Sequence, residues 1–320
     1  MKKLMLRLLP VVDLALVPFL YPAAWLLKLV RRIGVDRLPA SRHALLRVGV
    51  FPIRDHYYEP QFDHRRPRQP FSRERTLPGI DWRASEQLEM LARFSSLSEE
   101  LRGIPRRKPD PLDFYLDNEA FLSGDAEYWY QLIRVLKPRR IFEAGSGHST
   151  LMARRAIRRN QEQDSDYRCR HVSIEPYEAP WLESTGVTVV REKLEDLDVA
   201  FFSELEENDI LFIDSSHVIR PQGDVVFAYL ELLPSLGKGV VVHIHDIFSP
   251  ANYPGEWLEK HVRFWNEQYL LEAFLSHNHD WKIMGALNFL HHHHYDKLKS
   301  VAPFLTPDRE PGSFYMRKAT

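Results

Sequence analysis

The sequence is poor in cysteine and in net charge. Cys169 is its only cysteine in 320 residues, so the chain can form no internal disulfide and no Cys-x-x-Cys site for zinc or redox chemistry. A reducing compartment is therefore expected. The near balance of 43 Lys and Arg against 44 Asp and Glu hides an asymmetry, because residues 1–110 hold 21 basic and 12 acidic residues. The first third of the chain thus has a different surface from the rest.

The chain also lacks the glycine patterns that bind phosphate groups. Residues 140–150 carry glycines at 145 and 147, but Thr150 stands where a dinucleotide fingerprint needs a third glycine, and no lysine follows as in a P-loop. An apolar run before this turn and a helical pattern at 151–159 indicate a strand that passes into a helix. Such a turn offers free N–H groups and a positive helix end to a polar ligand. Glu143 before it would repel a pyrophosphate but suits an ammonium group.

An acid followed by Gly-x-Gly resembles the first motif of the class I S-adenosylmethionine-dependent methyltransferases. The resemblance implies S-adenosylmethionine as the cofactor, with its amino acid end near Glu143. The turn supplies five further cofactor-binding candidates: Gly145, Ser146, Gly147, His148 and Ser149. The structural alternative is a tight turn in some other α/β protein.

The order of apolar runs in the remaining core predicts an α/β fold. An amphipathic helix at 127–136 precedes the seven expected strands, at 141–143, 171–175, 187–190, 209–214, 239–244, 281–284 and 313–316. Continuous Val, Ile and Leu runs are typical of strands buried on both faces, so the sheet should be mainly parallel, with an antiparallel last strand. We therefore expect a Rossmann-like, seven-stranded sheet with helices on both faces, which matches the methyltransferase order. Glu175 ends the second strand, where an acid can accept hydrogen bonds from a ribose diol.

Two further motifs end strands at the edge where open α/β sheets bind ligands. Asp214-Ser-Ser-His217 follows the fourth strand and His243-Ile-His245-Asp246 ends the fifth, so both should reach the crevice beside Gly145. Two acids can hold a hard divalent cation while an imidazole stays free to take a proton. A hydroxyl acceptor needs such a site, because an alcohol is a poor nucleophile until its proton is removed.

This arrangement resembles the magnesium-dependent sugar O-methyltransferases that act on macrolide antibiotics. The resemblance makes Asp214 and Asp246 metal ligands, with Asp214 also next to the cofactor, and it makes His217 the catalytic base. Where that group has a second acid, this chain has His245. An imidazole can still bind a divalent ion but lowers the charge of the site, so the need for Mg²⁺ and the identity of the metal stay open. A packed core histidine is the alternative for His243 or His245.

Two later segments allow both a functional and a structural interpretation. Residues 263–269, expected to be helical, combine aromatic, amide and charged side chains that could form a sugar-binding wall. Packing of Phe264, Trp265 and Tyr269 into the core is the alternative. The tract His291–His294 is expected to be a solvated turn, with a weak metal contact at most.

The N-terminal third divides into two expected segments. Residues 1–32 are apolar from Leu8 to Leu27 except for Asp13, with basic residues at both ends. Three prolines argue against one straight span, so we expect an interfacial or re-entrant hairpin with peripheral membrane contact through residues 4–30. Packing on the domain or on a second subunit, in a homo-oligomer, is the alternative. Residues 33–124 are expected to form an extension over the mouth of the active site, and 125–320 the methyltransferase domain.

Together these features predict a cytoplasmic enzyme, at the inner face of a membrane if the N-terminal contact holds. It would move a methyl group from S-adenosylmethionine to a hydroxyl of a small molecule or glycan. A cofactor-binding scaffold without turnover and a hydroxylase-like metalloenzyme remain alternatives. A nucleic-acid acceptor is not expected, because Ser-Ser-His, and not an Asn-Pro-Pro-Tyr type of motif, follows the fourth strand.

Overall fold

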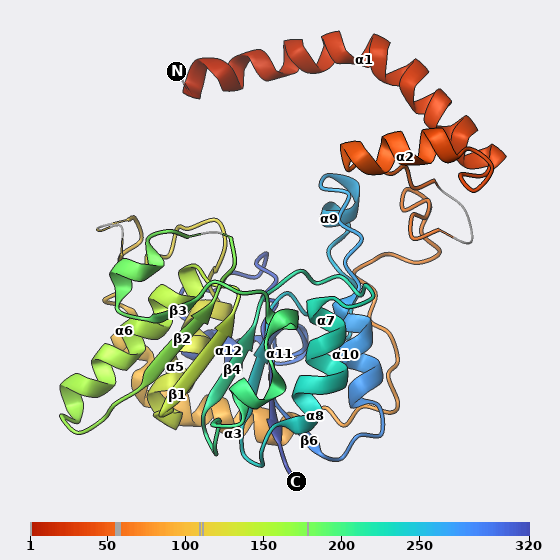
Figure 1. The fold of residues 1–320 in the computed structure, drawn as a ribbon. Coiled ribbons are helices and arrows are strands. Elements are labelled where there is room, and N and C mark those ends of the chain that lie inside the picture. The colour runs from red at the N-terminus through yellow and green to blue at the C-terminus, as the bar shows by residue number, and fades with distance from the viewer. Residues whose placement is uncertain (1, 55–58, 109, 111, 178) are drawn as a thin grey trace. The chain divides into compact units, whose positions relative to one another are not determined.

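The chain forms two compact units, Met1–Arg68 and Gln69–Thr320 (Figure 1). The structure is a computed structural model that describes residues 2–54, 59–108, 110, 112–177 and 179–320, without the side chains of residues 2–7. The second unit starts well before Asp125, where we expected the domain to begin. Helix α3 (Ala84–Phe94) belongs to it and buries Phe94 completely. Part of the expected extension is thus core.

The second unit is built on one seven-stranded sheet in the order β3-β2-β1-β4-β5-β7-β6. Its strands are β1 (Arg140–Ala144), β2 (Arg170–Ile174), β3 (Thr188–Val190), β4 (Ile210–Ile213), β5 (Val241–Ile244), β6 (Trp281–Ala286) and β7 (Phe314–Lys318). All neighbouring pairs are parallel except those of β7, which runs antiparallel to β5 and β6. The predicted Rossmann-like fold is confirmed.

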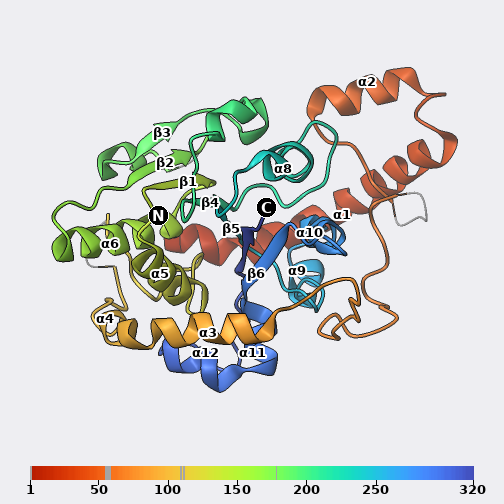
Figure 2. The ribbon, with the colours of Figure 1, turned by 90° about the horizontal axis from the view of Figure 1, so that it is seen from below.

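Helices cover both faces of this sheet, as Figure 2 shows from below. Besides α3 they are α4 (Ser98–Leu101), α5 (Asp125–Leu136), α6 (His148–Gln163), α7 (Asp224–Phe227), α8 (Leu233–Ser235), α9 (Gly255–Glu259), α10 (Glu267–Leu275), α11 (Leu287–His293) and α12 (Tyr295–Val301). Short 3₁₀ turns are η1 (Ser95–Leu97), η2 (Leu182–Thr185), η3 (Leu194–Asp196) and η4 (Val199–Phe202), and η5 (Ala228–Leu232) is a π-helical segment that joins α7 to α8.

The continuous apolar runs of the strands follow from burial on both sides. Along β4, Ile210 and Phe212 belong to one hydrophobic core, with α3, α5 and α6, whereas Leu211 and Ile213 belong to the other, with η5 and α10. Successive strand residues point to opposite faces, so most positions of a central strand are apolar. Polar side chains inside the strands are few, Glu143 and His243 among them, and the loops that follow the strands carry most of the functional groups at one edge of the sheet.

The first unit is dominated by two helices, α1 (Lys2–Ile33) and α2 (Pro39–Val48). Helix α1 continues through Pro10, Pro18 and Pro22, so it is one helix and not the hairpin that the prolines suggested. Each proline removes one backbone hydrogen bond, and the remaining bonds of a long helix can carry it past such a site. Residues 8–33 are long and apolar enough to cross a membrane, and none of them is buried.

Candidate active site

The glycine turn after β1 is fixed by the strand beside it. Gly145 has a φ of +85°, and a Cβ built on it would lie 1.9 Å from the carbonyl oxygen of Asp214. No side chain fits there, so the turn can approach the end of β4 only with glycine at this position. Gly147 is different: its φ of 172° is extended backbone, its N–H donates to Thr150 Oγ1, and helix α6 starts at the next residue.

A cavity of about 710 Å³ opens between this turn, the end of β2 and the loop after β4. Four of the expected site residues line it: Gly145, Ser146, Glu175 and Asp214. The lining also includes residues that the sequence did not single out: Tyr177, Lys193, Glu195 and Arg220. Arg220 and Glu195 form an ion pair of 3.5 Å across this part of the cavity. Glu195 could have been found from the sequence, because it is an acid that follows the third strand by a few residues.

The other four cofactor candidates have different surroundings. Glu143 is completely buried, and its Oε2 lies 2.8 Å from His171 Nε2 on the neighbouring strand. His148 is half-buried against Tyr115, with ring centroids 5.2 Å apart. Gly147 precedes it, and the carbonyl of buried Ser149 accepts a hydrogen bond from Trp129. None of these four lines the cavity.

The predicted acid and histidine motifs meet beside this cavity. Nε2 of His217 lies 3.2 Å from Asp214 Oδ1 and 3.6 Å from Asp246 Oδ2. Its Nδ1 lies 2.8 Å from Glu267 Oε2, at the start of α10. Glu267 is fully buried and was not predicted individually, although it lies in the segment 263–269. Both His217 and Asp246 have positive φ angles, 59° and 58°, a strained conformation that clusters at functional sites.

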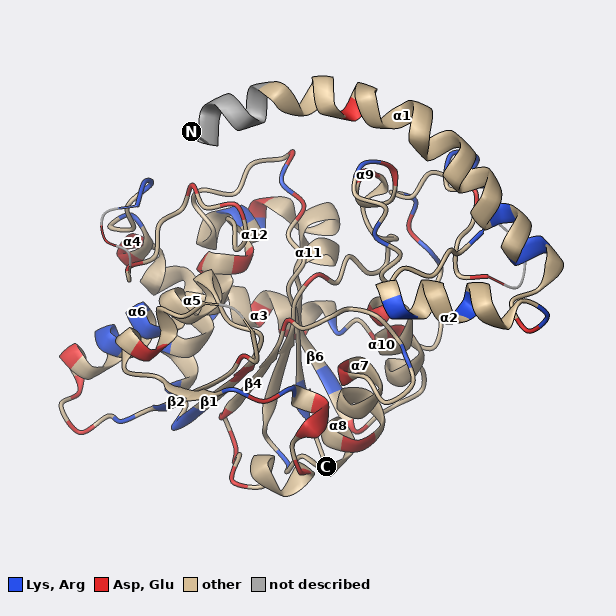
Figure 3. Ribbon diagram, turned by 45° about the horizontal axis from the view of Figure 1, so that its top comes forward, with Lys and Arg blue, Asp and Glu red and all other residues tan. Residues whose placement is uncertain are grey.

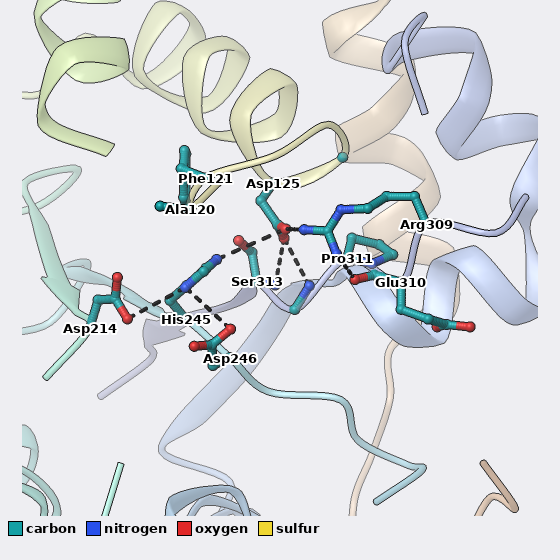
Figure 4. Close-up of polar contacts among 12 residues, drawn as sticks. Ala120, Phe121, Asp125, Asp214, His245, Asp246, Arg309, Glu310, Pro311 and Ser313 are labelled. Atoms are coloured by element: carbon teal, nitrogen blue, oxygen red, sulfur yellow. Dashed lines mark hydrogen bonds and ion pairs between the residues drawn. The ribbon is translucent and has the colours of Figure 1, made fainter. Parts of the chain in front are cut away.

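His245 joins the same cluster from the other side, as Figure 4 shows. Its Nδ1 lies 3.4 Å from Asp214 and 3.5 Å from Asp246, and its Nε2 lies 3.9 Å from Asp125 Oδ2. Asp125, in the first turn of α5, also accepts hydrogen bonds from the backbone N–H groups of Gly312 and Ser313, and it forms an ion pair with Arg309. Sequence gave no signal for Asp125, because an acid at this helical position is expected as a capping residue alone.

Burial and charge perturb every ionisable group in the cluster. Burial alone would lower the pKa of His217, but the carboxylates of Asp214 and Glu267 raise it to about 10. Burial opposes protonation of His245 as well, yet Asp246 and Asp214 raise its pKa. The two imidazoles in turn lower the pKa of Asp214 despite its burial. Burial raises the pKa of both Asp246 and Glu267. Burial and the neighbouring charges thus act in opposite directions on the members of this cluster.

This donor set fits a divalent cation. Asp214, His217 and Asp246 each offer one ligand atom, and the three atoms lie within 4.8 Å of one another. The carboxylate oxygens of Asp214 and Asp246 suit a hard ion, and with these two as ligands the imidazole of His217 stays free to take a proton. His245 lies within 3.5 Å of both acids, so the sequence prediction that it joins the metal group stays open.

An aromatic cluster covers His217. The ring of Trp265 lies 4.3 Å from the imidazole, and the guanidinium of Arg263 lies 4.8 Å from the Trp265 ring. Trp257 packs edge-on against Trp265 and also contacts Arg263. Residues 263–266 form a loop before α10 and not the helix that we expected. Phe264 and Trp265 are half-buried and Tyr269 is exposed, so the three lie between the two interpretations that the sequence left open.

The histidine tract is structured and not the solvated turn that we expected. His291, His292 and His293 lie in α11, and His291 is buried with Nε2 3.2 Å from the carbonyl oxygen of Pro307. His292 pairs with Glu310 at 2.8 Å. Ligand atoms of His291, His292 and Glu310 also lie within 4.8 Å of one another. This group is separate from the residues that line the cavity.

Comparison with known proteins adds two findings. Residues 142–247 match the family described as a methyltransferase domain, a range that includes the glycine turn and both acid and histidine motifs. An uncharacterized protein of Archaeoglobus fulgidus is 30% identical to this chain over 174 residues. The similarity covers 50% of this chain and 76% of the archaeal protein. Neither comparison extends to a macrolide-sugar group, a metal or an acceptor.

Proposed function

We propose that this chain, which belongs to the methyltransferase-domain family, transfers a methyl group from S-adenosylmethionine to a hydroxyl group of a small molecule or glycan. One observation carries the proposal. Asp214 lines the 710 Å³ cavity and is also the residue nearest to His217 Nε2. A donor held in the cavity and an acceptor held at the cluster would therefore meet at Asp214, as methyl transfer requires.

The cavity suits a donor that carries a ribose and an ammonium group. Gly145 and Ser146 line it beside the start of α6, and Glu175, directly after β2, lines it as well. An acid at this position accepts hydrogen bonds from the two hydroxyls of a ribose. When bound, S-adenosylmethionine supplies a methyl group already activated on a sulfonium centre. The protein then has to position the two reactants and remove the proton of the acceptor.

His217 is the proposed base, and its neighbours decide its protonation state. With a pKa raised to about 10, the imidazole is protonated at neutral pH and cannot accept a proton. A divalent cation would polarise an acceptor hydroxyl and offset the carboxylate charge that raises this pKa. Asp214 and Asp246 are the residues that would hold it, and Glu267 would then keep His217 oriented through Nδ1. We therefore include Mg²⁺ as a cofactor, whose main effect would be to lower the pKa of His217.

The test is isothermal titration of the full chain with S-adenosylmethionine and with its demethylated product, each with and without Mg²⁺. We expect micromolar binding that is lost in Glu175→Ala and retained in Glu231→Ala, a matched exposed acid that does not line the cavity. Separate titration with Mg²⁺ should give a heat that Asp246→Asn abolishes. Absence of binding by either ligand, in a folded sample, would contradict the methyltransferase proposal.

The alternatives make different predictions in the same experiment. A scaffold that keeps only the cofactor site would bind S-adenosylmethionine but give no demethylated product with any hydroxyl acceptor. A hydroxylase-like metalloenzyme would bind a divalent metal at Asp214 and Asp246 without affinity for the sulfonium ligand. In the proposed enzyme, His217→Ala should lose turnover while binding of S-adenosylmethionine stays within a few fold. Full activity of that variant would exclude His217 as the base.

A further inference from the structure

Helix α1 has an apolar surface on every side. Successive residues of a helix are rotated by about 100°, so Leu14, Leu16, Phe19, Leu20 and Tyr21 point in widely different directions. Each of these side chains is about half exposed or more. A helix on the surface of a soluble domain has a polar face, whereas a helix that is apolar all round belongs in a core or in a lipid bilayer. None of residues 8–33 is buried in a core.

The length of the apolar stretch matches a bilayer. Leu8 to Leu27 is 20 residues of helix, about 30 Å at 1.5 Å per residue, which equals the thickness of a hydrocarbon core. Asp13 is its only charged residue and lies about 7.5 Å along the helix from Leu8, near one boundary. Prolines also occur in membrane-spanning helices, where local 3₁₀ or π adjustments and polar partners satisfy the backbone groups that a proline frees.

The end of this stretch has the composition of a membrane interface. Tyr21 and Trp25 lie in its last two turns, and the ammonium of Lys28 lies 5.0 Å from the Trp25 ring. Arg31 and Arg32 follow in the last turn of α1. Aromatic rings settle at the level of the headgroups, and long basic side chains extend to the phosphates beyond them. In the part of α1 that Figure 3 colours, one acidic residue precedes this end, where Lys and Arg gather.

We propose that α1 crosses a lipid bilayer once and anchors the methyltransferase unit on the side of the basic C-terminal end of the helix. Six basic residues in 28–47 are opposed only by Asp36, whereas three basic residues lie in 2–7. An excess of Lys and Arg marks the cytoplasmic flank of a span. The second unit therefore faces the cytoplasm, and the leaflet it meets is expected to be rich in anionic lipid.

Helix α2 is also consistent with contact to a lipid bilayer. It has no buried residue, and it combines Arg42 and Arg47 with exposed Leu46 and Val48. A short helix of this composition, directly after a span, fits the boundary between headgroups and acyl chains. The proposal does not depend on the methyl donor or on the acceptor, because it uses only residues of the first unit.

The first experiment separates a spanning helix from a peripheral one. The full chain is expressed in bacteria, and the membrane fraction is washed with carbonate at high pH. We expect wild type to stay in the pellet, and Leu16→Arg/Leu20→Arg to lower the pelleted fraction at least tenfold. Leu230→Arg, an exposed leucine of the second unit, is the matched control and should behave as wild type. Release of wild type by carbonate would contradict the span, as would a soluble oligomer in which α1 packs on a second copy.

The second experiment tests the sidedness and does not require a destabilising variant. In a Cys169→Ala background, Lys3→Cys and Arg37→Cys are labelled with a membrane-impermeant maleimide in intact spheroplasts. We expect labelling at position 3 only, and labelling at position 37 after lysis. Equal labelling of both positions before lysis, or of neither, would indicate a hairpin or in-plane helix and overturn the proposal. A mass that shows loss of α1 would identify a cleaved leader and overturn it as well.

Discussion

Asp125 offers the sharpest test of how the active site is held together. Its Oδ1 accepts N–H groups of Gly312 and Ser313 at 2.9 and 2.8 Å, and its Oδ2 lies 2.8 Å from Arg309. The carboxylate is fully buried. Replacement by alanine leaves two buried N–H groups without their acceptor, at a cost of about 1–3 kcal/mol each. The ion pair between Asp125 and Arg309 is lost as well, but this adds little to the cost because Arg309 is partly solvated.

We therefore expect Asp125→Ala to lower the free energy of unfolding of the second unit by about 3–5 kcal/mol. Asp125→Asn keeps an oxygen for both N–H groups but turns an NH₂ toward Arg309, so about half that loss is expected. Asp308→Asn, a matched acid exposed beside Arg309, should leave stability close to that of wild type. Urea unfolding in mild detergent, followed by tryptophan fluorescence, measures all three. A loss below about 1 kcal/mol in Asp125→Ala would refute this role.

The effect should also depend on pH with a definite sign. Burial opposes the charged form of Asp125, but His245 and Arg309 lower its pKa below the usual value of 3.8. A carboxylate with a lowered pKa stabilises the fold above its unfolded pKa, and this contribution is lost as the pH falls through the folded value. The difference between wild type and Asp125→Ala should thus be complete at pH 7 and shrink below about pH 4.

Three further outcomes are expected. Gly145→Ala should abolish binding of S-adenosylmethionine and lower the Tm, since its Cβ would lie 1.9 Å from a carbonyl oxygen. Gly147→Ala should do neither, because its Cβ would meet open space and its φ is extended. Calorimetry measures the binding and thermal unfolding the Tm, and equal behaviour of the two variants would contradict the tight turn at Gly145. Cys169 is half-buried, and desolvation raises the pKa of its thiol to about 12, so it should react with iodoacetamide at pH 8 far more slowly than in urea; equal rates would contradict the raised pKa. Asp246→Asn should leave the metal-free fold as stable as wild type or about 1 kcal/mol more stable, because it removes a carboxylate whose charged form burial disfavours; a clear loss of stability without metal would show that the imidazoles already compensate that charge.

The strands could be predicted to within about two residues because the physics behind them is local. A central strand buried on both faces is mostly apolar, so runs such as 209–214 and 239–244 stand out in the sequence although His243 lies inside the second. The same argument located Asp214, His217 and Asp246, since they stand where such runs end. The order of elements then predicted the sheet, because short right-handed crossovers leave few topologies.

Contacts between distant segments were beyond the sequence. Glu143 had the features of a ligand for an ammonium group, but the parallel register of β1 and β2 sets it diagonally across from His171, and the two bond to each other. Asp125 had the features of a helix-capping acid, yet packing of α5 brings it to His245, 120 residues later. A carboxylate has the same local signature in either role, and only its neighbours in space decide which role it takes.

The prolines of α1 and the histidines of α11 are two further cases in which contacts beyond the local sequence decided the structure. Pro10, Pro18 and Pro22 suggested a hairpin, because each removes a helix hydrogen bond, but one long helix absorbs all three losses. His291–His294 suggested a solvated turn, but the carbonyl of Pro307 and the carboxylate of Glu310 provide partners for the buried and half-exposed rings. The sequence alone determined the periodicity, the strand ends and the glycine turn, since these depend on neighbours along the chain. Only the tertiary structure decided which charges face one another, since Coulomb energy and hydrogen bonding act over a few ångströms of space, whatever the separation along the chain.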